Sequence, residues 1–569
     1  MRCAIGLRLF RFGDSRARKN AVSLHWYTGK GQDRDMGKTL SVDKLLNAAR
    51  KAAVAEDWMA AHRAYQQVLK RFPKNPRARD GLQKLAPKAL PALLAQAQQL
   101  QNAAEWSDAA RVLTAARDFA PDLAEVGLAL AACLLEIGRA PAALDALSHV
   151  LARQPDNVTA LNFQGRALRE MGQSDAAQKS LEKAIKVGGP SAQTLNNLGI
   201  LAQANGRADE AVDHFSRALA LEPKNCELHF SLAQAKRHDP DDPAISDMQR
   251  LAGELSASAP GYARLQFALF KALDDVGARE AAFQHLILAN DSEKKRKPYD
   301  FQKDAVPYAL CRGLLGVAAN HTAADAAPFT PIFVTGLPRS GTTLIERILS
   351  MADGAQACGE LPVVQLAVSA RLKAIMARED KSFSADDAKD LRADILSGLS
   401  DYSDGRPVLI DKMPLNFRWI GFIAEALPEA RIVHIARDPM AVAWSLFRLS
   451  FQSAGHGFVH SFEDIAKYMV LHQEWMSHWR GTYGERIVDL VYEDMIAHPQ
   501  EQTQALAKAV GLAWSDAWLH PEKATSQVLT ASAHQVRQPI YGDSNAQWKR
   551  YETQLEPLRI ALSENGFAV

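Results

Sequence analysis

Residues 331–350 read PIFVTGLPRSGTTLIERILS, and this stretch determines how the C-terminal half of the chain folds. A β-branched apolar run, Ile332 to Thr335, leads directly into a glycine-rich turn and then into an apparent helix, Ile345 to Ser350. The spacing of Gly336 and Gly341 matches a phosphate-binding Walker loop, in which glycine lets backbone N–H groups point inward and the helix N-terminus adds its positive dipole end. The turn therefore predicts a site for an anion.

The charged residues in and after this turn differ from those of a nucleotide hydrolase. A P-loop kinase or NTPase needs a lysine directly after the second glycine, but that position is Thr342, and the cation is Arg339 inside the turn. No later strand ends in an aspartate for Mg²⁺, because the apolar run 432–436 is followed by Arg437. We therefore predict an anion site that needs no metal, and we disfavour a kinase or NTPase.

Four short apolar runs, of which the first precedes this turn, predict a parallel sheet. They are rich in β-branched residues, alternate with helical segments and lie at 331–335, 408–410, 431–436 and 487–491. Buried runs of this length between helices are typical of parallel strands in an α/β fold. We expect residues 328–569 to form one P-loop-like α/β domain with a central parallel sheet.

The N-terminal half contains a repeat. Gly138, Gly172 and Gly206 mark turns between helices, and both intervals, 172 minus 138 and 206 minus 172, are 34 residues. Small residues recur with the same period where two helices must approach closely, at Ala109, Ala143, Ala177 and Ala211. The copy at 192–223 resembles the tetratricopeptide consensus. The fold class is therefore multidomain, an α-solenoid of tetratricopeptide repeats followed by the α/β domain.

The repeat pattern and the changes in composition divide the chain into five segments. We expect a disordered basic arm at 1–38, the repeat domain at 40–225, a helical cap at 226–294, a linker at 295–327 and the α/β domain at 328–569. The cap follows from the loss of the period after Cys226, because the last repeat of a solenoid otherwise exposes its apolar face.

Composition excludes several classes of protein. Of 569 residues, 67 are Lys or Arg and 65 are Asp or Glu, a net charge of +2 that argues against a general nucleic-acid-binding surface. The 5 cysteines form no Cys-x-x-Cys pair and no Cys/His cluster, so we predict a reducing, cytoplasmic location without a zinc site or a disulfide framework. No run of residues is long and apolar enough to suggest a membrane span.

Four motifs in one order resemble the sulfotransferases that use 3′-phosphoadenosine 5′-phosphosulfate. They are PRSGTTL at 338–344, DKMP at 411–414, RDP at 437–439 followed by Ser445, and YED at 492–494. Together with the repeats, they make the chain look most like the tyrosylprotein sulfotransferases and their bacterial relatives that carry tetratricopeptide repeats. The resemblance implies a transferase that moves a sulfuryl group from this donor to a hydroxyl group.

The resemblance also implies a role for each matching residue. The 5′-phosphosulfate contacts would come from the turn, namely Arg339, Ser340, Gly341, Thr342 and Thr343. Arg437 and Ser445 would hold the 3′-phosphate, since eight residues place Ser445 about two helical turns beyond the arginine. Lys412 would face the leaving oxygen, and Tyr492 would lie beside the adenosine.

For the general base, the resemblance points to Glu360 in the Cys-Gly-Glu segment at 358–360. A carboxylate needs a raised pKa to serve near neutral pH. His434 and His534 are rival bases. Near the C-terminus, Ser532 would approach the phosphosulfate, and Lys549, with Arg550 as its alternative, would approach the 3′-phosphate.

The acceptor is the least defined part of the prediction. A repeat solenoid offers a concave surface for an extended peptide, which favours a protein or peptide hydroxyl, tyrosine among them. Lipid, sugar and small-molecule hydroxyls stay open, because Leu361 and Pro362 stand where the animal enzymes carry charged residues. The alternative function is a repeat-based interaction scaffold with a non-catalytic nucleotide-binding domain.

Overall fold

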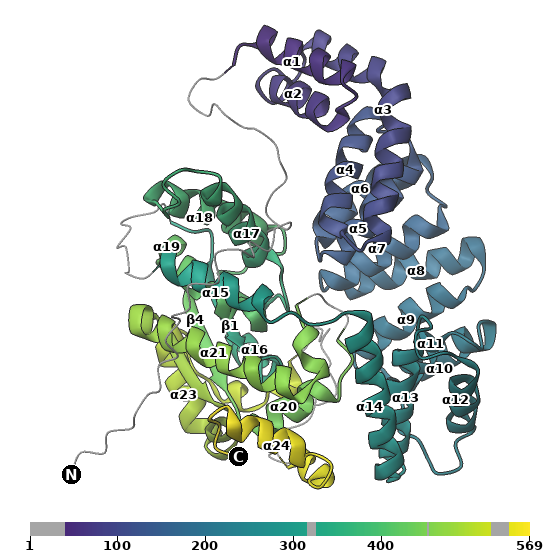
Figure 1. Cartoon of the computed structure of the whole chain (residues 1–569), viewed down its shortest axis with the longest axis vertical. Coiled ribbons are helices and arrows are strands. Elements are labelled where there is room, and N and C mark those ends of the chain that lie inside the picture. Colours follow the sequence, from purple (N-terminus) through teal and green to yellow (C-terminus); the bar gives the residue numbers. More distant parts are fainter. Residues whose placement is uncertain (1–39, 316–325, 452–454, 525–545) are drawn as a thin grey trace, which may run out of the picture.

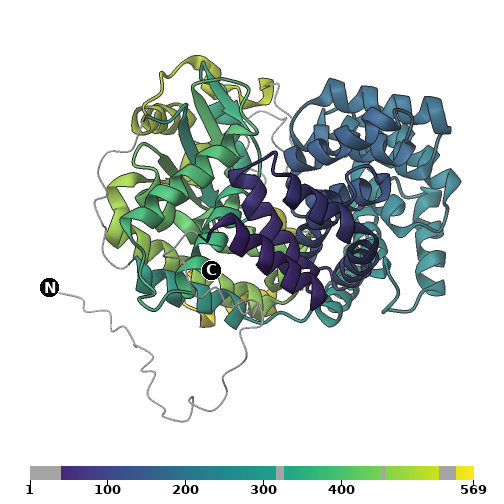
Figure 2. The same cartoon turned by 90° about the horizontal axis from the view of Figure 1, so that it is seen from above.

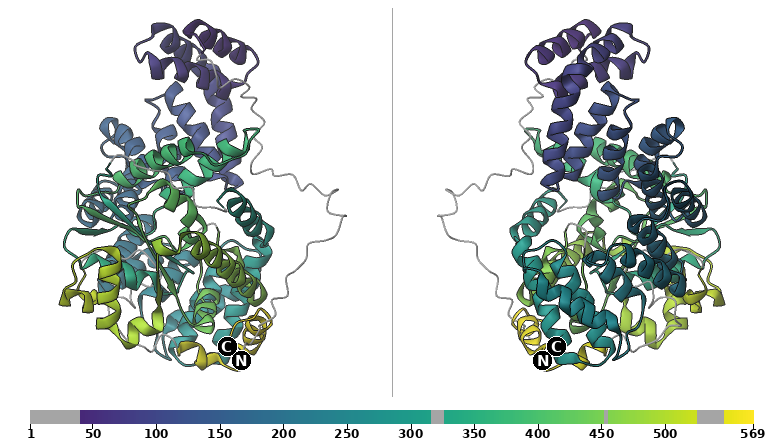
Figure 3. Two further views of the ribbon diagram at one scale, coloured as in Figure 1. Left: turned by 90° about the vertical axis from the view of Figure 1, so that its left-hand side faces the viewer. Right: turned by 90° about the vertical axis from the view of Figure 1, so that its right-hand side faces the viewer.

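The computed structural model consists of a helical repeat domain followed by an α/β domain (Figure 1), and it describes residues 40–315, 326–451, 455–524 and 546–569. This arrangement confirms the predicted fold class. In Figure 3 the first helices lie at one end of the molecule and the last helix at the opposite end. Within the described ranges, no helix combines the length and the apolar character needed to cross a bilayer.

The repeat domain is a series of helix pairs that follow one another along the chain. The pairs are α1 (Val42–Val54) with α2 (Trp58–Arg71), α3 (Pro76–Asn102) with α4 (Trp106–Phe119), α5 (Ala124–Glu136) with α6 (Ala140–Arg153), α7 (Val158–Glu170) with α8 (Ser174–Gly188), and α9 (Ala192–Ala204) with α10 (Ala208–Leu221). The four recurring alanines are each 0 % exposed, at Ala109, Ala143, Ala177 and Ala211. Their small side chains let the paired helices pack closely, as the sequence predicted.

The turns between paired helices share one backbone conformation. Gly138, Gly172 and Gly206 have φ values of 71°, 73° and 80°, which lie in the left-handed region that glycine adopts without steric cost. In the two earlier pairs the equivalent turn residues are Glu56 and Ala104, with φ values of 57° and 56°. The same turn is therefore present in the two earlier helix pairs, although they lack the glycine that marks it in the sequence.

The residues that follow the repeats pack on the α/β domain. They form α11 (Cys226–Ala235), α12 (Pro243–Glu254), α13 (Tyr262–Asp275) and α14 (Arg279–Arg296). Phe270 on α13 packs edge-on against Trp444 with ring centroids 6.2 Å apart, and the Tyr551 hydroxyl donates to Asp274 at 2.7 Å. These helices and the α/β domain share one hydrophobic core, so the predicted cap also joins the two domains.

The segment predicted as a linker holds a helix, α15 (Gln302–Leu314). Cys311 on this helix is fully buried, and the Tyr308 ring lies 4.8 Å from that of Trp475. Burial of these side chains stabilises the segment against the α/β domain. The charged residues before it had led us to predict an exposed linker instead.

The α/β domain is built on a five-stranded parallel sheet. Its strands are β1 (Thr330–Gly336), β2 (Ala355–Ala357), β3 (Val408–Asp411), β4 (Arg431–Ala436) and β5 (Ile487–Val491), in the order β2-β3-β1-β4-β5. The order reverses between β1 and β4, and the crevice outside the carboxyl ends of strands at such a reversal is where open α/β sheets bind ligands. The motifs found in the sequence lie at these strand ends. Asp411 is the last residue of β3, so the expectation that no later strand ends in an aspartate was wrong.

Helices cover both faces of the sheet. They are α16 (Thr342–Ser350), α17 (Val363–Met376), α18 (Ala385–Ser400), α19 (Ile420–Ala426), α20 (Pro439–Phe447), α21 (Phe462–Tyr483), α22 (Tyr492–Ala497), α23 (Pro499–Val510) and α24 (Glu556–Glu564). One face packs on α16 and α23, and the other on α19 and α21. Seen from above in Figure 2, the repeat domain and the α/β domain lie side by side.

Candidate active site

The turn after β1 has the backbone conformation of an anion-binding loop. Arg339 has φ 73° and Gly341, which precedes α16, has φ 112°. A Cβ atom at Gly341 would lie 2.5 Å from Cδ2 of Tyr492, so a side chain cannot fit there. The loop is thus held against the residue that follows β5, and both come to the carboxyl edge of the sheet.

Hydroxyl groups of the loop are buried at the start of α16. Ser340 is 1 % exposed, and among the described residues its Oγ has no hydrogen-bond partner. Thr342 and Thr343 are buried in the first turn of the helix, where N–H groups lack intrahelical acceptors. A buried hydroxyl without a partner is costly, so this arrangement suits a ligand that supplies acceptor oxygens, as a phosphosulfate does.

A second cationic region lies beside the loop, at the end of β4. The Arg437 guanidinium donates to the Arg339 carbonyl oxygen at 3.1 Å and stacks 4.4 Å from the centre of the Tyr492 ring. Asp438 caps α20 through the Ala441 N–H at 2.7 Å, and this helix carries the buried Ser445. The loop, Arg437 and Ser445 therefore come from neighbouring elements at one edge of the sheet.

Further arginines gather near Arg437. Burial lowers the pKa of the Arg448 guanidinium. Asp274 and Tyr551 oppose this shift, and the positive charges of Arg550 and Arg437 add to it. Lys549 is exposed, with its ammonium 6.0 Å from the Trp548 ring. Like charges brought together in this way favour an anionic ligand. Both C-terminal cations proposed from the sequence are exposed, and Arg550 is near enough to Arg448 to lower its pKa.

On the other side of β1, the end of β3 carries an ion pair. Lys412 is 0 % exposed, and its Nζ lies 2.7 Å from Oε1 of Glu360, whose side chain is 43 % exposed. The same Nζ lies 4.0 Å from Oε2 of Glu346 on α16. The structure thus brings the predicted lysine and the predicted base into direct contact, and it adds a second carboxylate that the sequence analysis missed.

Two buried carboxyl groups lie beneath this pair. Glu346 accepts the Gly359 N–H at 2.8 Å, and burial raises the pKa of its carboxyl group, against the opposing charge of Lys412. Asp411 accepts from the Leu361 N–H at 3.4 Å and from the Asn416 amide at 3.1 Å, and burial raises its pKa to about 8. The only sequence signal for Glu346 was its helical spacing, four residues after Thr342.

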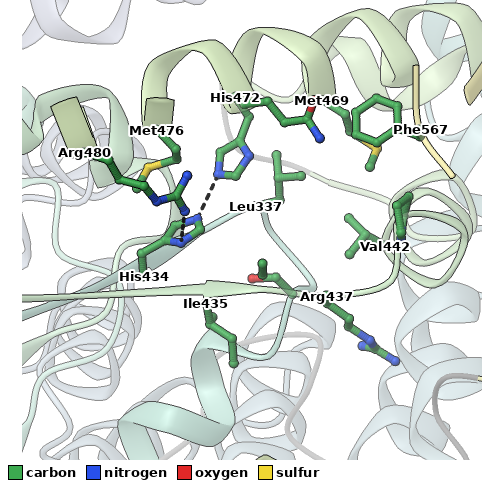
Figure 4. Close-up of a pocket in the computed structure, with 14 residues that line it drawn as sticks. Leu337, His434, Ile435, Arg437, Val442, Met469, His472, Met476, Arg480 and Phe567 are labelled. Carbon is green, nitrogen blue, oxygen red and sulfur yellow. Dashed lines mark hydrogen bonds between the residues drawn. The ribbon is translucent and has the colours of Figure 1, made fainter. Parts of the chain in front are cut away.

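The rival base His434 has partners of its own. Its Nδ1 lies 2.8 Å from Asp489, and its Nε2 lies 3.2 Å from Nε2 of His472. Burial lowers the pKa of both imidazoles. Both rings line a cavity of about 390 Å³ between β4 and α21, which also reaches Ser340 (Figure 4). Ser532 and His534 lie outside the described residues.

Family models match parts of both halves of the chain. The model of the sulfotransferase family matches residues 331–516, and a tetratricopeptide-repeat model matches residues 163–226. An uncharacterized protein of Aquifex aeolicus is 29 % identical over 64 % of this chain and 49 % of its own length. Protein-tyrosine sulfotransferase 2 of Gallus gallus is 24 % identical over 41 % of this chain and 67 % of its own length. The chain thus spans about half of the Aquifex aeolicus protein.

Two solved structures show partial likeness. The sulfotransferase domain of the Synechococcus PCC 7002 olefin synthase is 20 % identical with a TM-score of 0.30, and the match covers 44 % of this chain and 98 % of that domain. A tetratricopeptide repeat protein of Parabacteroides merdae is 17 % identical with a TM-score of 0.29, over 46 % of this chain and 94 % of its own.

Proposed function

We propose that this chain, which joins tetratricopeptide repeats to a domain of the sulfotransferase family, transfers a sulfuryl group from 3′-phosphoadenosine 5′-phosphosulfate to a hydroxyl group of an acceptor. One observation carries the proposal. The Lys412–Glu360 pair and the arginines around Arg437 lie on either side of the same anion-binding loop, at one edge of one sheet.

The donor would lie across this edge. Arg339, the loop amides and the hydroxyls of Ser340, Thr342 and Thr343 would hold its 5′-phosphosulfate, and the unpartnered Ser340 Oγ fits such a group. Arg437, Ser445 and Arg550 would hold the 3′-phosphate, with Lys549 at the rim, and Tyr492 would lie beside the adenosine. Because these positive charges already compensate the donor's phosphates, we propose that no metal takes part.

The transfer requires two groups from the protein, one that stabilises negative charge and one that accepts a proton. The acceptor oxygen forms a bond to sulfur while the bond from sulfur to the bridging oxygen breaks, and the leaving phosphate keeps that electron pair. Lys412 would stabilise the charge that builds on the bridging oxygen, and Glu360 would take the acceptor's proton. Each group is the other's partner at 2.7 Å, so the pair must separate before both can act.

The repeat domain supports a polypeptide acceptor. The Tyr402 hydroxyl, in the α/β domain, donates to the Gly138 carbonyl oxygen at 3.0 Å, and a Cβ at Gly138 would lie 3.1 Å from Pro362. Pro362 is two residues beyond Glu360, so the solenoid contacts the segment that holds the proposed base. We propose a protein or peptide hydroxyl as the acceptor, with tyrosine favoured by the names of the animal relatives.

The described cysteines are free thiols, which supports the proposal of a reducing, cytoplasmic location.

The test of function is a radiolabelled-donor assay with candidate peptide acceptors. We expect transfer by the parent chain and a loss of about 10²- to 10³-fold in kcat for Lys412→Ala, the scale of losing one group that stabilises a developing oxyanion.

The rivals predict different results from the same preparation. A scaffold with a non-catalytic nucleotide site predicts no transfer by the parent chain. An NTPase predicts Mg²⁺-dependent ATP turnover. Either result would contradict the proposal.

A further inference from the structure

We infer that Glu346 is a positioning residue for the proposed transfer. It fixes the segment that holds Glu360, and it serves as the remaining counter-ion of Lys412 when the lysine leaves Glu360 for the donor. The inference rests on the proposed function and deepens it by explaining how one buried lysine can serve two partners in turn.

The first observation is how the peptide before Glu360 is held. The backbone N–H of Gly359 donates to Glu346 Oε1 at 2.8 Å, and the Gly359 carbonyl oxygen accepts from the backbone N–H of Lys412 at 2.9 Å. Gly359 itself has φ 72°, a left-handed conformation that suits glycine. Glu346 and the end of β3 thus hold this peptide from both sides. The position of Glu360 depends on them, because it is the next residue.

The second observation is the charge balance around Lys412. An ammonium group that is 0 % exposed needs an anion nearby, since removing one partner of a buried pair is strongly destabilising. The two carboxylates within 4.0 Å of its Nζ differ, because Glu360 is 43 % exposed on its side chain whereas Glu346 is buried. Asp411 also interacts with Lys412, but burial raises its pKa to about 8, so its carboxyl group is protonated near neutral pH. Glu360 can therefore turn toward solvent or an acceptor, while Glu346 is held in place by its bond to Gly359.

These observations give the sequence of events. Lys412 moves from Glu360 to the bridging oxygen of the donor, and its charge stays compensated by Glu346. Glu360 then has no ammonium at hydrogen-bond distance, which makes it a stronger base for the acceptor hydroxyl.

The test is Glu346→Gln, which keeps the side-chain size and an oxygen for the Gly359 N–H but removes the charge. We expect kcat to fall about 10- to 100-fold, as for a small misplacement of reacting groups, while the affinity for adenosine 3′,5′-bisphosphate changes less than about threefold. The acid limb of the pH profile of kcat/KM should move to lower pH, because Glu360 alone then pairs with Lys412.

Glu425→Gln is the matched control. Glu425 is also buried, but it accepts from the Tyr483 hydroxyl at 2.8 Å on α21, and we expect it to leave kcat and the acid limb unchanged. A Glu346→Gln enzyme with the parent's kcat and acid limb would overturn the inference while leaving the proposed function intact. Absence of transfer by the parent chain would overturn both.

Should Glu346→Gln fail to fold, Glu346→Asp decides the question. This variant keeps the charge but shortens the reach, so it cannot hold Gly359 and approach Lys412 together. We expect a lower kcat with the acid limb in its parental position. The parental kcat in this variant, or an acid limb moved to lower pH, would overturn the inference.

Discussion

Replacing Gly341 by alanine tests whether the anion loop is built as the structure shows. The backbone there has φ 112°, which costs a side-chain-bearing residue about 1–2 kcal/mol. The added Cβ would also lie 2.5 Å from the Tyr492 ring, which is itself buried against the loop. Relief of that overlap requires Tyr492 to move, and overpacking of this kind costs about 1–3 kcal/mol.

The loss of ligand affinity in Gly341→Ala should be larger than backbone strain alone would cause. Arg437 stacks 4.4 Å from the Tyr492 ring, so displacing the ring also displaces the guanidinium proposed to hold the 3′-phosphate. We expect Gly341→Ala to lose about 2–5 kcal/mol of unfolding free energy in urea titrations. Its affinity for adenosine 3′,5′-bisphosphate should fall more than about tenfold, measured by calorimetry.

Gly405→Ala separates the two causes. Gly405 has φ 94°, but a Cβ there meets nothing within 4 Å. This control should lose only the backbone term of about 1–2 kcal/mol and bind the bisphosphate like the parent. If Gly341→Ala bound the ligand as tightly as the parent does, the loop would not be the anion site and the reasoning would be refuted.

Two further predictions concern Asp411 and the contact between the domains. The folded-state pKa of Asp411, about 8, lies above its unfolded value, so this group's contribution to stability is lost as pH rises from about 4 to 8. In urea titrations, the unfolding free energy of Asp411→Asn should therefore depend less on pH than that of the parent chain; the same pH dependence in both would contradict the burial argument. Tyr402→Phe removes the bond to Gly138, so KM for a long peptide acceptor should rise while KM for a short phenol stays constant. Tyr308→Phe is the control, because its hydroxyl donates from α15 to the Glu474 carbonyl oxygen, away from the solenoid; equal effects on both acceptors would exclude a role for the solenoid.

Much of the repeat domain could be predicted because its turns require a particular backbone. Glycine at 138, 172 and 206 is a visible consequence of a left-handed φ. The turn residues Glu56 and Ala104 adopt the same conformation without glycine, and there the sequence signal fails. The helix α3 runs through Pro87 and Pro91, residues that usually end a helix, because tertiary packing overrides local propensity.

The site was predictable where a motif follows a strand end. The loop, Lys412 and Arg437 each stand directly after an apolar run, and parallel strands bring their carboxyl ends to one edge. Glu346 was harder to identify, because its importance comes from burial and from the charges beside it. Those properties depend on which elements pack together, and no local pattern encodes them.

The central claim is that the loop and the end of β4 bind a sulfonated nucleotide through arginines and main-chain amides without magnesium. Calorimetry of adenosine 3′,5′-bisphosphate in the presence of EDTA measures this directly, with the parent chain and with a variant in which Arg339 and Arg437 are both alanine. We predict binding by the parent and at least about a hundredfold weaker binding by the double variant, since each charged hydrogen bond contributes about 1.5–3 kcal/mol. No binding by the parent, or equal binding by both, would contradict the account.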